Sequence, residues 1–321
     1  MWPVSKPSSG AATMPQATSQ SIPVRRGVAV LGLRNNSGRA DAAWLSTAIS
    51  EMLATELGAG GRIRVIPGAE VARVKADLGL GEPDTLSGDN LQKIRKRLDV
   101  ETLVLGSYAL VGEPDSLLRV DLRLLDAATG RELTTSSKSG TETQLSDLVS
   151  RTGAPIRQHL GLGDLTSIEA VALEASIPSN RDAVRYYTEG IAKLRSLDAA
   201  AAVESLSKAV SSDNKHPLIH AALSEAYSTL GNEARAKEEA SRAVALSEKL
   251  GPDQKLQIKA GSHKAAKEWG KAVEAEKSLF ESFPDNIEYG LNLANSQISA
   301  GRTKDALVTI EALRRLPARI S

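Results

Sequence analysis

The residues best placed to do chemistry form a short polar loop, Arg34 to Gly38, between an apolar run and a helix-forming segment. Backbone N–H groups in such a loop, together with the dipole of a following helix, favour an anion. Asparagine, serine and glycine are also the ordinary residues of turns. We therefore favour a turn here and keep anion binding as the weaker alternative, with Asn35, Asn36, Ser37 and Gly38 as its residues.

Other catalytic signatures are missing from the sequence. The glycine-rich loops that cradle nucleotides, the His-Arg-Asp and Asp-Phe-Gly motifs of protein kinases and the Gly-x-Ser-x-Gly elbow of hydrolases do not occur. Cysteine is absent, and the four histidines are scattered, without the His-Glu-x-x-His spacing that places two imidazoles on one helical turn. We therefore expect no catalytic residues, no metal site and no cofactor.

The composition argues against nucleic-acid binding and against a membrane span. The formal net charge is only +1, so the strong basic character of a nucleic-acid binder is missing. The basic cluster from Lys93 to Arg97 lacks stacking aromatic residues beside it, and we interpret it as the solvated face of a helix. No apolar run approaches the roughly 20 residues that span a bilayer. We expect a soluble chain that binds no nucleic acid.

A length of 321 residues predicts more than one domain. Residues 1–26 contain four prolines among Ser, Thr, Ala and Gln and carry little apolar material, which predicts a disordered tether. Short apolar runs and amphipathic helices then alternate from residue 27 to residue 161. The strand predicted over 117–126 alternates apolar and charged residues, and a turn at Thr129-Gly130 connects it to a further strand. These features predict an α/β domain with a mixed sheet.

The C-terminal part repeats itself about every 34 residues, the period of paired-helix arrays. Small and apolar residues recur at a constant offset, because neighbouring helices approach closely through small side chains. The recurring residues are Gly190, Ala202, Leu206 and Ala209, then Ser224, Ala236, Ala240 and Ala243, then Ala272 and Leu279, and finally Ala306 and Leu313. Four units are predicted, near 183–216, 217–252, 253–286 and 287–321, after a linker over 162–182.

These positions resemble the tetratricopeptide repeat family. The resemblance implies an all-α solenoid that binds a protein or peptide along the concave surface formed by the first helix of each pair. It places Tyr187, Ile191, Arg195, Glu225, Gln257, Lys264 and Asn295 in that groove. Their mixed character suggests a moderately polar peptide as the partner. The alternative is that these residues are the solvated face of a spacer.

The N-terminal half carries a second resemblance. Val28-Ala-Val-Leu, the loop at Asn36-Ser37-Gly38, Leu105-Gly-Ser-Tyr108 and the segment from Leu122 to Gly130 resemble the α/β domain related to the amino-terminal domain of TolB. Followed by tetratricopeptide repeats, it is similar to the region after the kinase domain and membrane helix of some bacterial serine/threonine protein kinases. If a membrane helix precedes this segment, the resemblance implies an extracytoplasmic location and a longer, membrane-anchored protein.

The sequence thus predicts a non-catalytic interaction or sensor module with an α/β domain and a tetratricopeptide-repeat solenoid. The alternative function is the ligand-sensing regulatory region of a bacterial serine/threonine kinase, whose catalytic domain would lie outside this chain.

Overall fold

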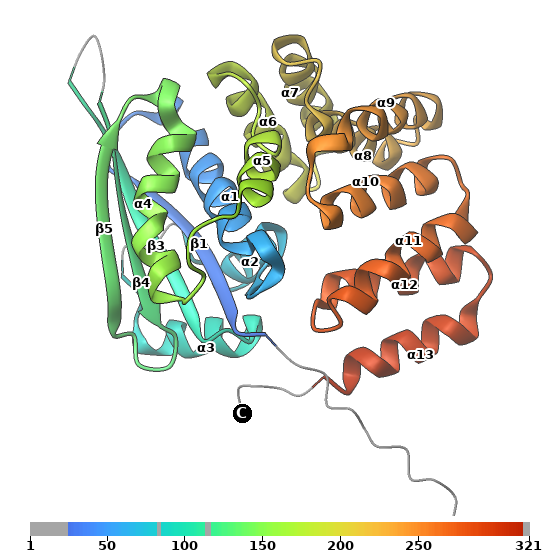
Figure 1. Ribbon diagram of the computed structural model, residues 1–321, viewed down its shortest axis with the longest axis horizontal. Helices are drawn as coiled ribbons and strands as arrows, with labels where there is room; N and C mark the ends of the chain where they lie inside the picture. Colours follow the sequence, from blue (N-terminus) through green and yellow to red (C-terminus); the bar gives the residue numbers. More distant parts are fainter. Residues whose placement is uncertain (1–24, 82–84, 113–116, 317–321) are drawn as a thin grey trace, which may run out of the picture.

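The computed structural model describes residues 25–81, 85–112 and 117–316, and it shows an α/β domain followed by paired helices (Figure 1). The predicted fold class is confirmed. Of the predicted tether, residues 1–24 lie outside the described part of the chain. The predicted tether also includes Arg25 and Arg26, and this part of the prediction is wrong, because both residues make defined contacts with the folded protein.

The α/β domain is built on one mixed sheet of five strands in the order β2-β1-β3-β4-β5. The first three pair in parallel, whereas the last two are antiparallel, as the predicted hairpin requires. The strands are β1 (Gly27–Asn35), β2 (Arg64–Val65), β3 (Thr102–Val111), β4 (Leu117–Asp126) and β5 (Glu132–Gly140).

Helices cover both faces of this sheet. Residues of β1 alternate between the two layers because successive side chains of a strand point to opposite faces. Val28 and Val30 pack with α1 and α4, while Ala29 and Leu31 pack with α2 and α3. The helices are α1 (Trp44–Gly58) and α4 (Leu145–His159) on one face, and α2 (Gly68–Asp77) and α3 (Gly88–Leu98) on the other, with short 3-10 turns η1 (Ala40–Ala42), η2 (Ala59–Gly61) and η3 (Glu142–Gln144).

The predicted linker contains a helix of its own, α5 (Ser167–Ala175). Its N-terminus is closed by a capping box, in which the Thr166 hydroxyl accepts from the Glu169 N–H and the Glu169 carboxylate accepts from the Thr166 N–H. The two side chains thus accept hydrogen bonds from two backbone N–H groups that have no partner within the helix. The connection between the two parts of the chain therefore contains an ordered helix.

Four helix pairs follow, and their first helices begin at residues 181, 217, 252 and 287, which are 36, 35 and 35 residues apart. Alanine and leucine side chains at the recurring positions are buried where the helices touch, except for Leu313, which is half-buried. The pairs are α6 (Arg181–Arg195) with α7 (Ala199–Ser212), α8 (Pro217–Thr229) with α9 (Glu233–Leu246), α10 (Pro252–Ala265) with α11 (Trp269–Ser282), and α12 (Ile287–Ser299) with α13 (Thr303–Arg314), and the short turn η4 (Ser247–Lys249) follows α9.

Within the described residues, both α6 and the α11–α12 turn of the repeats contact the α/β domain. Helix α6 packs on α1, where Arg195 Nη2 lies 2.7 Å from Glu51 Oε1. At the α11–α12 turn, Arg25 Nη2 lies 2.6 Å from Oδ1 of the buried Asp285, and the Arg25 guanidinium also donates to the Gly61 carbonyl at 3.0 Å. The Arg25 guanidinium lies 4.8 Å from the centre of the Phe283 ring. These contacts, together with the ion pair between Arg181 of α6 and Glu142 of η3, join the halves of the protein.

Candidate functional site

The groove residues predicted in the first unit are engaged within the protein. Tyr187 is half-buried between the first two helix pairs, and its ring centre lies 6.2 Å from that of His216. Ile191 is half-buried against the same apolar cluster, and Arg195 pairs with Glu51 of α1. In this unit the surface that would bind a partner is already used for packing and for contact with the α/β domain.

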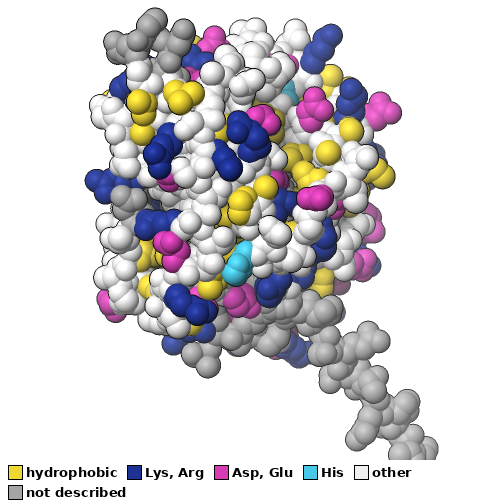
Figure 2. Space-filling view, turned by 60° about the vertical axis from the view of Figure 1, so that its left-hand side comes forward, with side chains coloured by type: hydrophobic (Ala, Val, Ile, Leu, Met, Phe, Trp, Pro, Cys, Tyr) yellow, Lys and Arg dark blue, Asp and Glu magenta, His cyan; other side chains and the backbone are white. Residues whose placement is uncertain are grey.

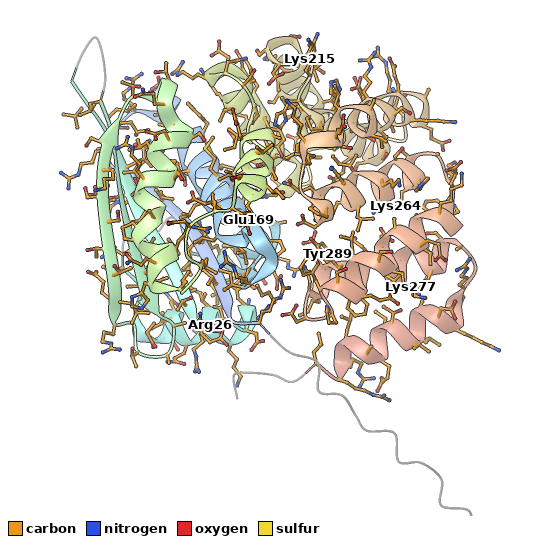
Figure 3. The ribbon with its side chains drawn as sticks, in the orientation of Figure 1. Arg26, Glu169, Lys215, Lys264, Lys277 and Tyr289 are labelled. Atoms are coloured by element: carbon orange, nitrogen blue, oxygen red, sulfur yellow. The ribbon has the colours of Figure 1, made fainter. Side chains whose placement is uncertain are left out.

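The groove residues of the other three units are more open. Glu225 and Asn295 are exposed to solvent. Gln257 is also exposed, and its side-chain amide donates to the Tyr289 hydroxyl at 2.6 Å. Lys264 Nζ lies 3.0 Å from Oε1 of Glu276, a carboxylate that is only 2% exposed. Lys264 lies between α10 and α11, whereas Tyr289 lies at the end of α12 that is nearer to the α/β domain (Figure 3).

The side of the repeats that carries these groove residues is acidic in its second and fourth units. Desolvation by the neighbouring protein atoms raises the pKa of Glu225, and the positive charge of Lys264 partly offsets this shift. The pKa of Glu288 is raised first by the surrounding protein and then by the carboxylates of Glu70 and Glu225. Because like charges disfavour ionisation of a neighbour, these carboxylates make a surface that would be stabilised by a cationic group.

The first helix of the last pair adds apolar side chains to this surface. Ile287, Leu291 and Ile298 of α12 are 43%, 45% and 57% exposed. Leu291 and Ile298 lie four residues before and three residues after Asn295, and residues at this spacing share one face of a helix. The exposed face of α12 is therefore amphipathic.

The predicted anion loop is held by its own side chains. The Asn35 carboxamide oxygen accepts from the Ser37 N–H at 2.9 Å, and the Asn36 N–H donates to the Tyr108 carbonyl. The Ser37 hydroxyl in turn accepts from the Arg39 N–H at 3.3 Å. The N–H groups of Asn36 and Ser37, which an anion would need, thus already donate to acceptors within the protein. The hydrogen bonds of this loop are those of a turn.

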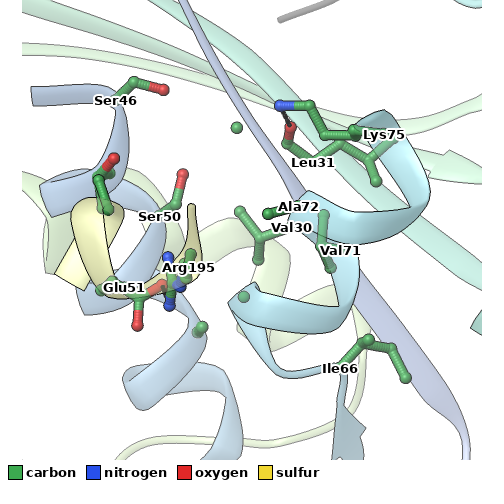
Figure 4. Close-up of a pocket in the computed structure, with 15 residues that line it drawn as sticks. Val30, Leu31, Ser46, Ser50, Glu51, Ile66, Val71, Ala72, Lys75 and Arg195 are labelled. Carbon is green, nitrogen blue, oxygen red and sulfur yellow. Dashed lines mark hydrogen bonds and ion pairs between the residues drawn. The ribbon is translucent and has the colours of Figure 1, made fainter. Parts of the chain in front are cut away.

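A cavity of about 210 Å³ lies elsewhere in the α/β domain, at the outer edge of β1 (Figure 4). Strand β2 pairs with β1 only at Gly27 and Val28, so helices rather than a strand flank the rest of this edge. The cavity is lined by Val30, Leu31 and Gly32 of β1, by Ser46, Thr47, Ser50, Glu51 and Ala54 of α1, by Gly68, Val71, Ala72 and Lys75 of α2, by Ile66, and by Ala192 and Arg195 of α6.

Sequence reasoning did not find this cavity. The available signal was Gly32, an isolated glycine inside a predicted strand, which typically marks a bulge. Gly32 has a φ of +99°, and the register between β1 and β3 shifts between Val30 and Leu33. Bulges occur next to functional sites because they change the direction of neighbouring side chains.

Among the described residues, no three His, Asp or Glu side chains are arranged to hold a metal ion. None of the helices in the described ranges has the length and apolar content needed to cross a bilayer. On the face seen in Figure 2, basic and acidic side chains are interspersed rather than gathered by sign.

Comparison with known proteins gives structural similarity only. No protein-family model and no curated protein matches the chain. The LpoB C-terminal domain from Salmonella enterica is similar over 38% of this chain and 87% of its own, with 14% identity and a TM-score of 0.30. A lipoprotein from Neisseria meningitidis is similar over 44% of this chain and 99% of its own, with 21% identity and a TM-score of 0.31.

A putative kinesin light chain with TPR-like repeats from Podospora anserina is similar over 54% of this chain and 86% of its own, with 20% identity and a TM-score of 0.33. At this level of similarity, none of these proteins indicates a partner or ligand of this chain.

Proposed function

We propose that the protein is a non-catalytic interaction module that binds a protein or peptide through the first helices of its second to fourth helix pairs. The observation that carries this proposal is the amphipathic exposed face of α12, where Leu291 and Ile298 flank Asn295. Exposed apolar side chains grouped on one helix are typical of surfaces that a partner covers.

The neighbouring charges indicate the kind of partner. Glu225 and Glu288 lie on the same side of the array, and the charge of Glu225 raises the pKa of Glu288. A peptide with apolar residues and at least one basic side chain would cover the apolar face of α12 and relieve the repulsion among these carboxylates. The first unit contributes less to such a site, since its Arg195 is paired with Glu51.

The proposal is tested by selecting peptides from a random library against the full-length chain and measuring their affinity by calorimetry. We expect the double variant Leu291→Asp and Ile298→Asp to weaken the selected peptides at least tenfold, because its carboxylates would have to be buried in the complex. Leu307→Asp is the matched control, since Leu307 is 66% exposed on α13, the second helix of the pair.

The control should retain affinity, and circular dichroism should be the same for all three proteins. Equal loss of binding in Leu307→Asp and in the double variant would overturn the proposal, as would peptides that bind without regard to Leu291 and Ile298. The association of this chain with a TolB-like domain family or with a kinase stays a prediction of the sequence resemblance.

A further inference from the structure

Helix α5 belongs to a segment that is anchored at both of its ends. Leu162, before the helix, is 1% exposed in an apolar cluster of the α/β domain, and the half-buried Ile177, after it, packs against the same cluster. The Gly163 carbonyl accepts from Arg157 Nη2 at 3.1 Å. Residues 163–176 therefore leave this core and return to it, so that α5 can change its position while both anchors stay packed.

The contacts of α5 itself are few. None of its residues from Ser167 to Ala175 is buried. Ile168 and Val171 are 81% and 50% exposed, and their spacing of three places them on one face of the helix. Apolar side chains that face solvent do not hold a helix in place. A segment with so few buried contacts opens at a low cost in free energy.

The C-terminal end of α5 joins an apolar cluster of the repeats. Ala175 packs there together with Leu218 and Ala221 of α8, against Leu250, which precedes α10, and Ile258 of α10. The last two are buried, whereas the other three are half-buried. Figure 1 shows α5 between the α/β domain and the repeats. We call Leu218, Ala221, Leu250 and Ile258 the α8–α10 patch, to which α5 contributes Ala175.

The α8–α10 patch continues into the partner surface proposed above. Leu218, Ala221 and Glu225 are three and four residues apart, a spacing that places them on one face of α8. Glu225 is exposed and is one of the carboxylates of that surface. A partner that follows this face of α8 from Glu225 toward the start of the helix meets Ala175 at the patch. The partner and α5 therefore compete for it.

We propose that α5 is an internal competitor of the partner, and that the partner displaces it with a helical segment of its own. This inference rests on the proposed function. Because α5 is part of the same chain, a high effective concentration keeps it on the patch, although Ala175 offers only one methyl group. A free partner lacks that advantage and must bury more apolar surface. We therefore expect it to present a larger apolar side chain, such as leucine, in the place of Ala175.

The test uses a synthetic peptide with the sequence of residues 165–177 and the substitution Ala175→Leu. In the full-length protein, Ala175→Asp places a carboxylate against the apolar patch, and we expect α5 to leave it. Hydrogen exchange of the α5 amides should become about tenfold faster, while the α6 amides keep their rate. The peptide should bind this variant saturably in an NMR titration up to about 5 mM. It should bind the unmodified protein about fivefold more weakly, since α5 occupies the patch there.

Two further variants separate this contact from the general effect of an added charge. Ala170→Asp adds the same charge at an exposed position of α5, and it should leave the α5 exchange and the peptide affinity as they are in the unmodified protein. Leu218→Asp changes the patch instead of the helix. It should also release α5, but it should bind the peptide about tenfold more weakly than Ala175→Asp does.

Unchanged exchange of the α5 amides in Ala175→Asp would overturn the proposal, as would equal affinity of the peptide for this variant and for the unmodified protein. Library-selected peptides that depend on Leu291 and Ile298 but leave the α5 exchange unchanged would also overturn it, while the proposed function would stand. If no selected peptide depends on these two residues, the proposed function fails. Tighter binding of the α5 peptide to Ala175→Asp would even then show that α5 occupies an interaction patch.

Discussion

The two halves of this protein are stabilised by different kinds of packing. In the α/β domain, two clusters of large aliphatic side chains cover the two faces of the sheet. The largest fully buried side chains in the described residues, Tyr108 and a set of leucines and isoleucines, all belong to this domain. The repeats are held instead by smaller clusters in which alanine is frequent.

Both halves bury polar groups, such as Glu56 and Arg157 in the α/β domain, and the repeats hold theirs between the helices of a pair. The ring of His220 lies 2.5 Å from the Glu239 carboxylate and 2.9 Å from the Asn214 carbonyl, and the Ser224 hydroxyl donates to the Ala236 carbonyl. Such groups require exact partners, since an unsatisfied one is costly. The close helix contacts of the repeats should therefore tolerate larger or charged side chains poorly, because their small residues leave no room for them.

The largest effect is expected at the close contacts between helices. Ala236→Glu would force a carboxylate into the contact between α8 and α9, where Ala236 is 1% exposed, and should cost several kcal/mol, about 4 or more. Ala240→Arg should act in the same way, because Ala240 is 3% exposed. Thermal melts followed by circular dichroism would measure the loss.

Lys237→Glu is the control for these variants, since Lys237 is exposed on the same helix. It should change the unfolding free energy by less than about 0.5 kcal/mol. Unchanged melting of both alanine variants would show that the alanine positions are not the close contacts of the array, and the contrast between the halves would fail.

A smaller loss of unfolding free energy is expected when the pH is lowered, and it comes from His216 in the repeats. Burial lowers the pKa of His216 from 6.5 to about 4, while Asp213 opposes this shift. The native state therefore keeps His216 neutral, whereas the unfolded chain protonates it near pH 6.5. Its contribution to stability is complete above pH 6.5 and is lost as the pH falls toward 4, by up to about 3 kcal/mol.

Urea unfolding at several pH values would measure this decline. His216→Phe should make the unfolding free energy less dependent on pH between 6.5 and 4, since the titrating group is gone. His263→Asn should preserve the decline, because His263 lies near the surface beside Glu268. The same slope in His216→Phe and in the unmodified protein would contradict the assignment.

The smallest effect concerns the contact between the halves. Hydrogen bonds from Arg25 lower the pKa of Asp285 although burial raises it. Arg25→Ala would leave the Asp285 carboxylate, 1% exposed, with the backbone N–H of residue 25 but without its cation. We expect a loss of about 2 kcal/mol, less than for a fully buried pair, because the Arg25 side chain is 20% exposed.

Urea unfolding of Arg25→Ala should also show two separated transitions, as the halves lose one of their connections. Arg302→Ala, which removes an exposed pair with Glu274, is the control and should cost less than about 0.5 kcal/mol. A single transition with unchanged midpoint in Arg25→Ala would show that the α6–α1 contact alone couples the two halves.

Much of the architecture could be predicted from the sequence because its signals are local. The period of the repeats, the alternation in β4 and the turn at Gly130 depend on residues that are close along the chain. The shared helix face of Leu291, Asn295 and Ile298 likewise depends only on their spacing along the chain. They could not show that Arg195 would pair with Glu51, 144 residues earlier, instead of facing a partner.

The sequence by itself therefore determined which segments are helices or strands and which faces they bury, since side-chain periodicity sets both. Only the tertiary structure decided that Arg25 anchors the α11–α12 turn and that α6 closes a cavity beside β1. Both features depend on how far β2 extends and on how the repeats dock. These are outcomes of packing between distant elements, and no spacing of neighbouring residues encodes them.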